Sequence, residues 1–311
     1  MPDIQEILST KTREIDDWLH GYFKKIGTEN GYPRVLAEAA AYSLFSGGKR
    51  IRPVLTLLVN EACGSAPSRA LPLAAAVEMI HIYSCIHDDL PAMDDDDFRR
   101  GRAACHKHYD EATAILAGDA LLTEAFGALS LAEDRECLPR LVRLLADAAG
   151  FQGMVAGQMA DIEAEKAAHK QGSGPQVRAA DAADARSAEL AFIHAHKTGA
   201  LLSVSVLLPG VANRLPEENL AALSQFGESL GLAFQIVDDI LNETADEKTL
   251  GKPVGTDRES GKLTWVTLHG LDAARAMAKK EIDRAIAAVE FFGERAAPLQ
   301  ILARYVLDRD R

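Results

Sequence analysis

Apolar side chains recur every three or four residues along most of the chain, a spacing typical of amphipathic helices. Near the start, Ile4, Ile7, Leu8, Ile15 and Leu19 follow this spacing. The same pattern predicts further helices at residues 54–63, 70–87, 112–131, 138–162, 187–208, 217–241, 262–289 and 296–307. No stretch alternates apolar and polar residues as a half-buried strand does. The pattern therefore predicts an all-α protein.

Glycine and proline interrupt these helices at residues 47–48, 53, 64–67, 209–210 and 251–255. Residues 166–184 are small and polar and contain Gly-Ser-Gly-Pro at 172–175, so we interpret them as a flexible surface loop. Neither a short repeat nor a change of composition marks a domain boundary. We therefore expect a single domain over residues 1–311.

The composition narrows the class of protein. A chain of 311 residues, 48% of them hydrophobic, can bury a large core. Its net charge of −12 argues against nucleic-acid binding, which usually needs a basic surface. Local clusters of cations can still bind phosphate groups inside an acidic protein.

Cysteine usage and hydropathy favour a cytoplasmic protein. No C-x-x-C pair occurs among the four cysteines, which are Cys63, Cys85, Cys105 and Cys137. We therefore expect free thiols in a reducing compartment, without a disulfide framework or zinc site. Residues 1–22 are amphipathic and charged, unlike a signal peptide. The longest apolar stretch, residues 201–211, is short and contains Pro209, so we expect no membrane span.

An acidic segment, H-D-D-L-P-A-M-D-D-D-D-F-R-R-G at residues 87–101, follows a long apolar helix. Its carboxylates form two groups separated by residues 90–93: Asp88 and Asp89, then Asp94, Asp95, Asp96 and Asp97. Such a charge run is usually a solvated loop. The adjacent Arg99 and Arg100 instead indicate a cavity where carboxylates hold metal ions and guanidinium groups hold an anion. An EF-hand beginning at Asp94 is excluded, because it needs Gly at Arg99 and Glu at Cys105.

A second acidic pair, Asp238 and Asp239, lies in F-Q-I-V-D-D-I-L-N at residues 234–242, near the end of another apolar helix. Asp238 and Asn242 are four residues apart and share a helical face. One such pair alone is more often structural. Two acidic centres at the ends of apolar helices predict that carboxylates of facing helices hold Mg²⁺, together with substrate phosphate oxygens.

Cations that could hold a phosphate ligand lie in several segments. Residues 47–53, G-G-K-R-I-R-P, carry Lys49, Arg50 and Arg52 but lack the P-loop pattern, which disfavours an ATP site. A basic helix start still suits an anion. Other segments contribute His81, Lys197, Lys252 and Lys262. Each of these residues alone is weak evidence for a phosphate-binding site.

With these motifs the sequence closely resembles the short-chain trans-isoprenyl diphosphate synthases, and among them the bacterial farnesyl diphosphate synthases. Five motifs carry the resemblance in order: G-G-K-R-I-R-P, D-D-L-P-A-M-D, H-K-T-G, F-Q-I-V-D-D-I-L and L-G-K-P-V-G-T-D. The resemblance implies one domain of antiparallel helices around a central cavity, usually a homodimer. It implies a prenyltransferase that joins isopentenyl diphosphate to an allylic diphosphate, with two or three Mg²⁺ ions or alternatively Mn²⁺.

The resemblance also implies roles for individual residues. The metal ligands would be Asp88, Asp89, Asp94, Asp238 and Asp239. Isopentenyl diphosphate would bind to Lys49, Arg52, His81 and Arg100. The allylic diphosphate would bind to Arg99, Lys197 and Lys252. Thr198, Gln235 and the carbonyl of Lys197 would lie beside the allylic carbon. Gln158 and Asp161 match a further motif near the metal side, and Lys262 aligns with a recurrent lysine.

In the implied reaction, Mg²⁺ on Asp88, Asp94 and Asp238 neutralises charge on the leaving diphosphate. Isopentenyl diphosphate then attacks the allylic cation, and the released pyrophosphate, not a side chain, takes the final proton. Tyr83 lies five residues before Asp88, a rise of roughly 7.5 Å along a helix. The resemblance makes Tyr83, followed by Ser84, a floor that stops the product at fifteen carbons. Ordinary core packing of Tyr83 and a twenty-carbon product are the alternatives.

Three departures from the family pattern stand out. Asn242 replaces the usual Asp of the second motif, which weakens the outermost metal contact. Asp95 stands where Asn is frequent, and residues 166–184 are longer than in close relatives. A terpene cyclase is disfavoured because the chain keeps Lys49 and Arg52. A non-catalytic subunit is disfavoured because only one motif position is altered.

Overall fold

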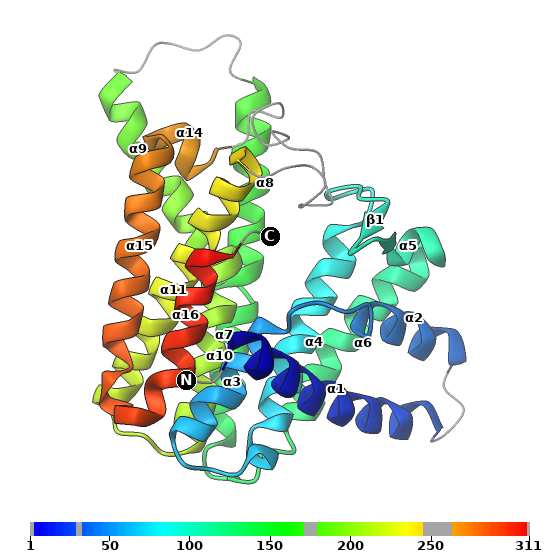
Figure 1. Ribbon diagram of the computed structural model, residues 1–311. Helices are drawn as coiled ribbons and strands as arrows, with labels where there is room; N and C mark the ends of the chain where they lie inside the picture. Colours follow the sequence, from blue (N-terminus) through cyan, green and yellow to red (C-terminus); the bar gives the residue numbers. More distant parts are fainter. Residues whose placement is uncertain (1–2, 29–32, 171–178, 245–262, 310–311) are drawn as a thin grey trace. The chain divides into compact units, whose positions relative to one another are not determined.

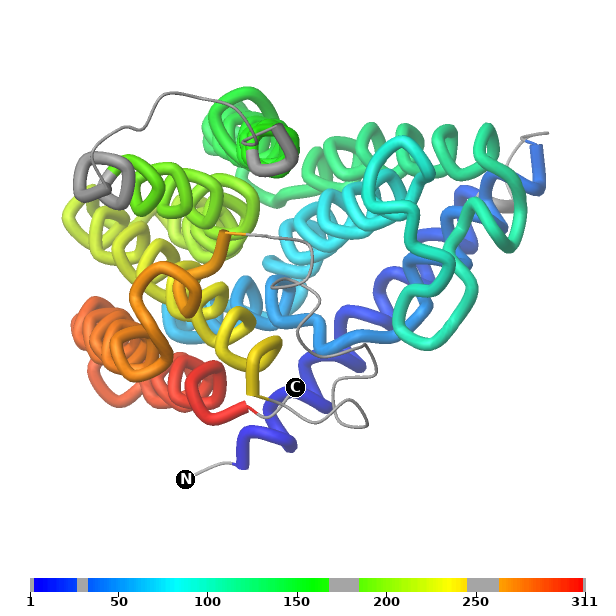
Figure 2. The backbone as a smooth tube through the Cα atoms, turned by 90° about the horizontal axis from the view of Figure 1, so that it is seen from above, coloured from blue at the N-terminus to red at the C-terminus, as the bar shows by residue number. Residues whose placement is uncertain are grey.

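Helices account for nearly all of the chain that the structure describes, as the apolar spacing predicts (Figures 1 and 2). The computed structural model describes residues 3–28, 33–170, 179–244 and 263–309. Two residues predicted to bind substrate, Lys252 and Lys262, lie outside the described residues. The chain divides into an N-terminal unit (Met1–Arg143 and Leu208–Leu215) and a C-terminal unit (Leu144–Leu207 and Pro216–Arg311). That these form one domain stays a prediction.

The N-terminal unit is built around one buried helix, α4. Its elements are α1 (Ile4–Thr28), α2 (Arg34–Leu44), α3 (Ile51–Ala62), η1 (Pro67–Arg69), α4 (Leu71–Asp88), β1 (Phe98–Arg99), β2 (Arg102–Ala103), α5 (Cys105–His108) and α6 (Glu111–Leu129). Helix α4 packs along α6 and buries apolar side chains on almost every side, among them Leu73, Val77 and Ile80. A helix that is apolar all round is a core helix. The buried helix α4 therefore ends at Asp88, where the first acidic segment begins.

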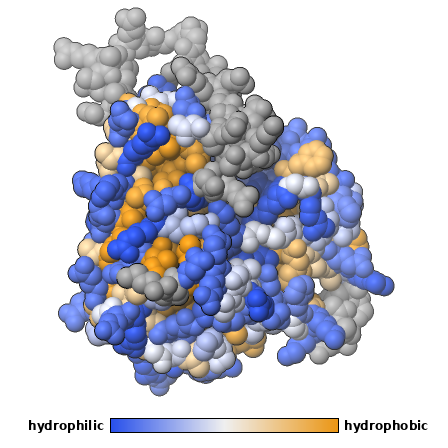
Figure 3. Space-filling view, viewed as in Figure 1, coloured by the Kyte–Doolittle hydropathy of each residue, from blue (hydrophilic) through white to orange (hydrophobic). Residues whose placement is uncertain are grey.

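The C-terminal unit centres on the long helix α11. Its elements are α7 (Leu138–Ala149), which begins in the N-terminal unit, α8 (Met154–Lys170), α9 (Ala179–Ile193), η2 (His194–Gly199), α10 (Ala200–Ala212), which ends in the N-terminal unit, α11 (Glu217–Thr244), α14 (Trp265–His269), α15 (Leu271–Ala288), η3 (Glu290–Ala296) and α16 (Ala297–Asp308). Helix α11 packs along α15. Ile236, Val237 and Trp265 belong to the buried cluster between these helices. Figure 3 shows apolar surface gathered over the C-terminal helices.

Glycine explains two differences from the predicted helices. The predicted helix 138–162 is divided into α7 and α8, because the chain turns at Gly150 and Gly153. A Cβ at Gly153 would lie 2.1 Å from the carbonyl oxygen of Ala148, so this turn requires glycine. The predicted helix 262–289 is broken at Gly270, whose φ of 82° lies in the left-handed region.

Other differences follow from weak or short patterns. Helix α2 was not predicted, and the strands β1 and β2 have two residues each, too few to show alternation. Both flanks of the predicted loop at 166–184 are helical, since α8 continues to Lys170 and α9 begins at Ala179. Alanine and lysine favour helix in these flanks. The predicted helix 187–208 contains a π-helical segment, η2, between α9 and α10.

Three helical stretches are longer and more apolar than the sequence analysis assumed. By length and hydropathy alone, Glu111–Leu129, Ala185–Ala212 and Glu217–Thr244 could cross a membrane. The apolar windows of these stretches are 39%, 50% and 56% buried inside the protein. Burial against neighbouring helices accounts for much of their hydropathy.

Two glycines bring α11 close to the chain that contains η2 and α10. A Cβ at Gly227 would lie 2.5 Å from the Cα of Ser203, and one at Gly231 would lie 2.8 Å from the Cα of Gly199. These distances are shorter than van der Waals contact. Glycine at these two positions, one helical turn apart, therefore permits backbone contact between the helices.

We predict that Gly227→Ala lowers the free energy of unfolding by about 1–3 kcal/mol, because the added methyl group overpacks a backbone contact. Urea denaturation followed by circular dichroism measures the change. The matched control is Gly21→Ala in α1, where no atom lies within 4 Å of the added Cβ. Alanine should stabilise that helix by about 0.5–1 kcal/mol. Equal effects of the two substitutions would contradict this account of the packing.

Candidate active site

The first acidic centre folds back on the end of α4. Asp88 is the last residue of the helix, and the backbone N–H of Asp94 donates a hydrogen bond to the carbonyl oxygen of Asp88 at 2.8 Å. Asp95 adopts a left-handed conformation with φ of 51°. Two residues predicted to bind metal therefore lie at the same helix end, with Asp94 exposed and Asp88 partly buried.

Asp89 differs from these neighbours because an arginine holds it. Its carboxylate accepts a hydrogen bond from Arg99 Nε at 2.6 Å, and its side chain is only 3% exposed. Burial raises the pKa of the Asp89 carboxyl, and the charge of Arg99 opposes this rise. Asp89 therefore positions Arg99 in this structure, whereas Asp88 and Asp94 face solvent more openly.

Arg100 is presented at the tip of a tight hairpin. The pairing of Arg99 with Arg102 leaves Arg100 and Gly101 as a two-residue turn, with φ of 52° and 74°. Positive φ at both positions is typical of a type I′ turn. Arg100 Nη1 donates to the carbonyl oxygen of Gly47, and Nη2 lies 3.4 Å from His81 Nε2. Two residues predicted to act in one subsite, His81 and Arg100, are thus brought together, and Arg100 also contacts the loop that carries Lys49.

Gly48 fits closely against this arginine. A Cβ at Gly48 would lie 2.6 Å from Arg100 Nη1, and the φ of Gly48 is 122°. Only glycine suits both the conformation and the space. The Gly pair of the basic motif is therefore required where the hairpin arginine docks.

His81 lies on α4, and the charges of several arginines from other segments act on it. Burial lowers the pKa of its imidazole well below the ordinary value, and the charges of Arg52, Arg100, Arg99 and Arg50 lower it further. The imidazole is therefore neutral at physiological pH. It can hydrogen-bond to a guanidinium or a phosphate without adding to the repulsion.

A recess opens beside these arginines. Its cavity volume is only about 20 Å³, and its lining includes Asp89 together with arginine and hydroxyl side chains: Arg99, Arg100, Arg102, Tyr42, Ser43 and Ser46. Guanidinium and hydroxyl groups donate hydrogen bonds and suit an anion. The lining is therefore suited to negative charge although the chain as a whole is acidic.

In the C-terminal unit, the π-helical segment η2 carries Lys197 and Thr198. Lys197 Nζ donates to Asp161 of α8 at 2.5 Å. A Cβ at Gly157 would lie 2.1 Å from the backbone nitrogen of Lys197, so glycine allows α8 to approach this segment. Single π-helical turns occur often at functional sites. The sequence pattern did not reveal this one.

The close contact of α11 with η2 also brings Gln235 to Thr198. The Thr198 hydroxyl donates a hydrogen bond to Gln235 Oε1. Gly231 precedes Gln235 by one helical turn and packs on Gly199. The two residues predicted to lie beside the allylic carbon therefore contact each other. Gln158 lies on α8, three residues before Asp161.

The second acidic centre shows two different environments. Asp238 accepts a hydrogen bond from Arg309 Nη2 at 2.6 Å, and its side chain is 41% exposed. The Arg309 guanidinium also lies 3.7 Å from the centre of the Phe234 ring. The sequence does not reveal Arg309 as a site residue, since nothing in the local pattern near it indicates a partner 71 residues away.

Asp239 is buried and caps another helix. One of its carboxylate oxygens accepts the backbone N–H of Trp265 at 2.8 Å, at the start of α14. The Trp265 indole N–H in turn donates to His194 Nδ1 at 3.0 Å. Asp239 therefore has a structural bond in addition to its predicted role as a metal ligand. Asn242 lies one turn beyond Asp238 on α11.

Tyr83 and Ser84 lie inside the N-terminal unit on α4. Tyr83 is 6% exposed, and its ring meets that of His87 edge to face at 5.8 Å. Burial and the nearby Asp88 raise the pKa of Tyr83 to about 12. The Ser84 hydroxyl donates to the carbonyl oxygen of His81. A bulky neutral ring therefore lies one and a half turns before the acidic centre.

The donor chemistry of Asp88 and Asp94 fits Mg²⁺, which prefers oxygen ligands. Within the described part of the chain, no three His, Cys, Asp or Glu side chains form a group that could hold a metal ion by themselves. Mg²⁺ usually binds one or two carboxylates and completes its shell with water and substrate phosphates. A site of this kind needs a phosphate-bearing ligand.

Comparison with known proteins shows the family. Residues 33–296 match the Polyprenyl synthetase family, and the chain belongs to it. A farnesyl diphosphate synthase of Geobacillus stearothermophilus is 42% identical over 88% of this chain and 86% of its own length. A chloroplastic geranylgeranyl pyrophosphate synthase of Catharanthus roseus is also 42% identical, over 89% of this chain and 75% of its own.

A solved structure supports the same conclusion. The geranylgeranyl pyrophosphate synthetase of Pyrococcus horikoshii is 32% identical, covers 98% of both chains and has a TM-score of 0.83. The predicted all-α fold, the resemblance to prenyl diphosphate synthases and the prenyltransferase activity are confirmed. The roles of individual site residues stay predictions.

We predict that His81 makes stability depend on pH. Because its pKa is lowered in the folded protein, the unfolded chain binds an extra proton below about pH 6.5. Stability should therefore fall as the pH falls below this value, by at most about 1.4 kcal/mol per pH unit. His81→Gln should remove this part of the decline. Denaturation curves of both proteins between pH 7.5 and 5 (about one point per half unit) test it, and parallel declines would contradict it.

We predict that Asp239→Ala destabilises the protein by about 1–3 kcal/mol more than Asp239→Asn. Asparagine keeps an oxygen that can accept the Trp265 N–H, whereas alanine leaves a buried donor without its partner. Thermal denaturation and activity should be measured for both variants. If Asp239 served only as a metal ligand, both variants would be equally inactive and as stable as the wild type.

Proposed function

We propose that the protein condenses isopentenyl diphosphate with dimethylallyl or geranyl diphosphate to form farnesyl diphosphate. One observation supports this most: the carboxylate-bearing end of α4 adjoins a hairpin whose arginine contacts the basic Gly47–Gly48 loop and His81. Metal-binding carboxylates beside phosphate-binding cations suit a diphosphate. The same arrangement has no use for a neutral substrate.

In this proposal, Asp88 and Asp94 of the N-terminal unit and Asp238 of the C-terminal unit would each be metal ligands, and Mg²⁺ would supply neutralisation of charge on the leaving diphosphate. Asp238 would exchange Arg309 for the metal, since Arg309 contacts it in this structure. Asp89 contributes by holding Arg99 toward the same helix end. Asp239 contributes by fixing α11 to the start of α14.

The basic residues divide between the two substrates. Lys49, Arg52, His81 and Arg100 bind isopentenyl diphosphate, and Arg99, Lys197 and Lys252 bind the allylic diphosphate. Fixed positive charge stabilises the diphosphate as the carbon–oxygen bond breaks. In the resting structure Asp161 orients Lys197, so this ammonium group is already positioned on η2.

The allylic cation formed by this cleavage needs negative dipoles and the absence of water. The Lys197 carbonyl and the Gln235 side chain provide the dipoles, and the Thr198–Gln235 bond fixes them. The double bond of isopentenyl diphosphate attacks the cation, forming a new carbon–carbon bond. A proton is then lost to the released pyrophosphate, so no side chain serves as general base.

Tyr83 limits the length of the product in this proposal. Its buried ring lies on α4 roughly 7.5 Å before Asp88 along the helix axis. A hydrocarbon growing along α4 from the acidic centre would meet the ring. Geranylgeranyl diphosphate is the second candidate product, because relatives with either name are equally similar to this chain. A cytoplasmic homodimer belongs to the same proposal.

We predict that the purified protein, with Mg²⁺, isopentenyl diphosphate and geranyl diphosphate, forms farnesyl diphosphate, and that Tyr83→Ala extends the product by at least one five-carbon unit. Removal of the ring lengthens the apolar path. Mass spectrometry of the products measures both effects, and Mg²⁺ removal by a chelator should abolish them.

Tyr83→Phe is the matched control, since it keeps the ring and should still release farnesyl diphosphate. Geranylgeranyl diphosphate from the wild type would reject the floor but keep the reaction. A folded wild-type protein that forms no prenyl product would reject the proposed function and direct attention to Asn242.

A further inference from the structure

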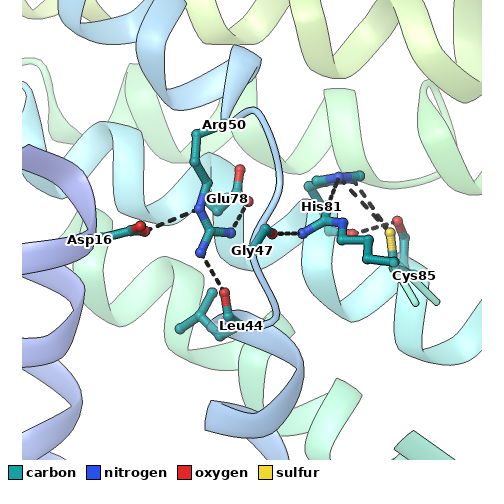
Figure 4. Close-up of polar contacts among 9 residues, drawn as sticks. Asp16, Leu44, Gly47, Arg50, Glu78, His81 and Cys85 are labelled. Atoms are coloured by element: carbon teal, nitrogen blue, oxygen red, sulfur yellow. Dashed lines mark hydrogen bonds and ion pairs between the residues drawn. The ribbon is translucent and has the colours of Figure 1, made fainter. Parts of the chain in front are cut away.

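Arg50 differs from the other cations of the basic motif, because its whole guanidinium group is occupied inside the protein (Figure 4). Nη1 donates to Glu78 of α4 at 2.5 Å, Nε to Asp16 of α1 at 3.1 Å, and Nη2 to the carbonyl oxygen of Leu44 at 2.6 Å. The side chains of Arg50 and Glu78 are 1% and 2% exposed. All three nitrogens of the Arg50 guanidinium group therefore donate to a protein acceptor.

These contacts exclude Arg50 as a direct ligand of substrate in this arrangement. A diphosphate could reach the guanidinium only by displacing a buried carboxylate. Lys49 and Arg52 flank Arg50 in sequence and are only partly buried, so they are the cations of the motif that a substrate can approach. The motif thus combines one internal cation with two external ones.

The backbone at Arg50 explains what the internal cation does. Arg50 has φ of 50° and is the N-cap of α3, where its carbonyl oxygen accepts the N–H of Val54. Left-handed conformation is unfavourable for a side chain with a Cβ. Such a residue persists where the surrounding structure determines it. The three side-chain hydrogen bonds of Arg50 hold its backbone in this conformation, at the turn that separates Lys49 from Arg52.

Helix α4 holds the same loop at a second point. The carbonyl oxygen of Gly47 accepts a hydrogen bond from Arg100, which also contacts His81. Glu78 and His81 are three residues apart and share a face of α4. The loop between α2 and α3 is thus fixed near both of its ends to one rigid, buried helix.

From these contacts we infer that Arg50 and Glu78 are positioning residues for the isopentenyl diphosphate site. This inference rests on the proposed function, in which Lys49 and Arg52 bind that substrate. The buried pair sets the turn between them, so their ammonium and guanidinium groups are directed to one anion. Lysine cannot replace Arg50 in this role, since a single ammonium group lacks the planar fork that meets three partners.

The test compares Arg50→Lys and Glu78→Gln with the wild type in steady-state kinetics and in calorimetric binding of isopentenyl diphosphate alone. We expect Arg50→Lys to raise the KM and Kd for isopentenyl diphosphate about tenfold and Glu78→Gln about threefold to tenfold. The KM for the allylic diphosphate and kcat should change less than about twofold. A merely structural role would lower the melting temperature without this selectivity.

Arg34→Lys and Glu38→Gln are the matched controls, because this exposed pair in α2 undergoes the same chemical changes away from the loop. They should leave both KM values unchanged. Unchanged affinity for isopentenyl diphosphate in folded Arg50→Lys or Glu78→Gln, or an equal loss for both substrates, would overturn the inference. If the wild type itself forms no prenyl product, the proposed function fails instead.

A variant that does not fold is replaced by the double variant Arg50→Met with Glu78→Leu. Removing both charges leaves no unpaired buried ion, so the fold should be recovered. The turn would still lack its three side-chain bonds. A folded double variant with wild-type affinity for isopentenyl diphosphate would overturn the inference, and a selective loss would support it.

Discussion

Repulsion among the arginines that surround His81 is the constraint on which the N-terminal unit depends. Four of them act on this imidazole: Arg50, Arg52, Arg99 and Arg100. Buried cations need partners, because an uncompensated charge in the interior is strongly destabilising. Glu78 and Asp89 are almost fully buried and neutralise two of these arginines, and His81 itself remains uncharged. Positive charge is thus gathered around His81 while the two most buried arginine contacts are neutralised by carboxylates.

Several residues near the predicted ligands have an unfavourable backbone conformation. Arg50, Asp95 and Arg100 all adopt left-handed conformations, which non-glycine residues rarely do. Each lies within a few residues of a predicted ligand. Conformations of this kind cost about 1–3 kcal/mol each and occur where surrounding contacts hold them. For Arg50 those contacts are hydrogen bonds to three other segments, and for Arg100 they are the hairpin and the carbonyl of Gly47. Ligand position in this unit therefore depends on contacts between segments distant in sequence.

This dependence explains how far the sequence could predict the structure. Helices such as α4 and α11 have strong periodicity, and their acidic ends are local patterns, so both were predicted. The π-helical segment η2 has the same spacing of apolar residues as an ordinary helix and was missed. Glu78 and Arg309 were also missed, because an isolated Glu in an apolar helix or an Arg at a chain end shows no partner. The residues of the motifs could be predicted from the sequence, but the distant residues that contact and position them could not.

The C-terminal unit has ion pairs of its own, but it positions Thr198 and Gln235 with neutral contacts. Gly227 and Gly231 allow backbone contact between α11 and the η2–α10 chain, and this contact places Gln235 beside Thr198. Close packing leaves little freedom for side-chain rearrangement. A reaction through an allylic cation needs dipoles that are fixed before charge develops. Glycine contacts can fix uncharged dipoles without introducing a competing anion near the cation. Buried ion pairs thus position the charged side chains around His81, and helix packing positions the uncharged dipoles of Thr198 and Gln235.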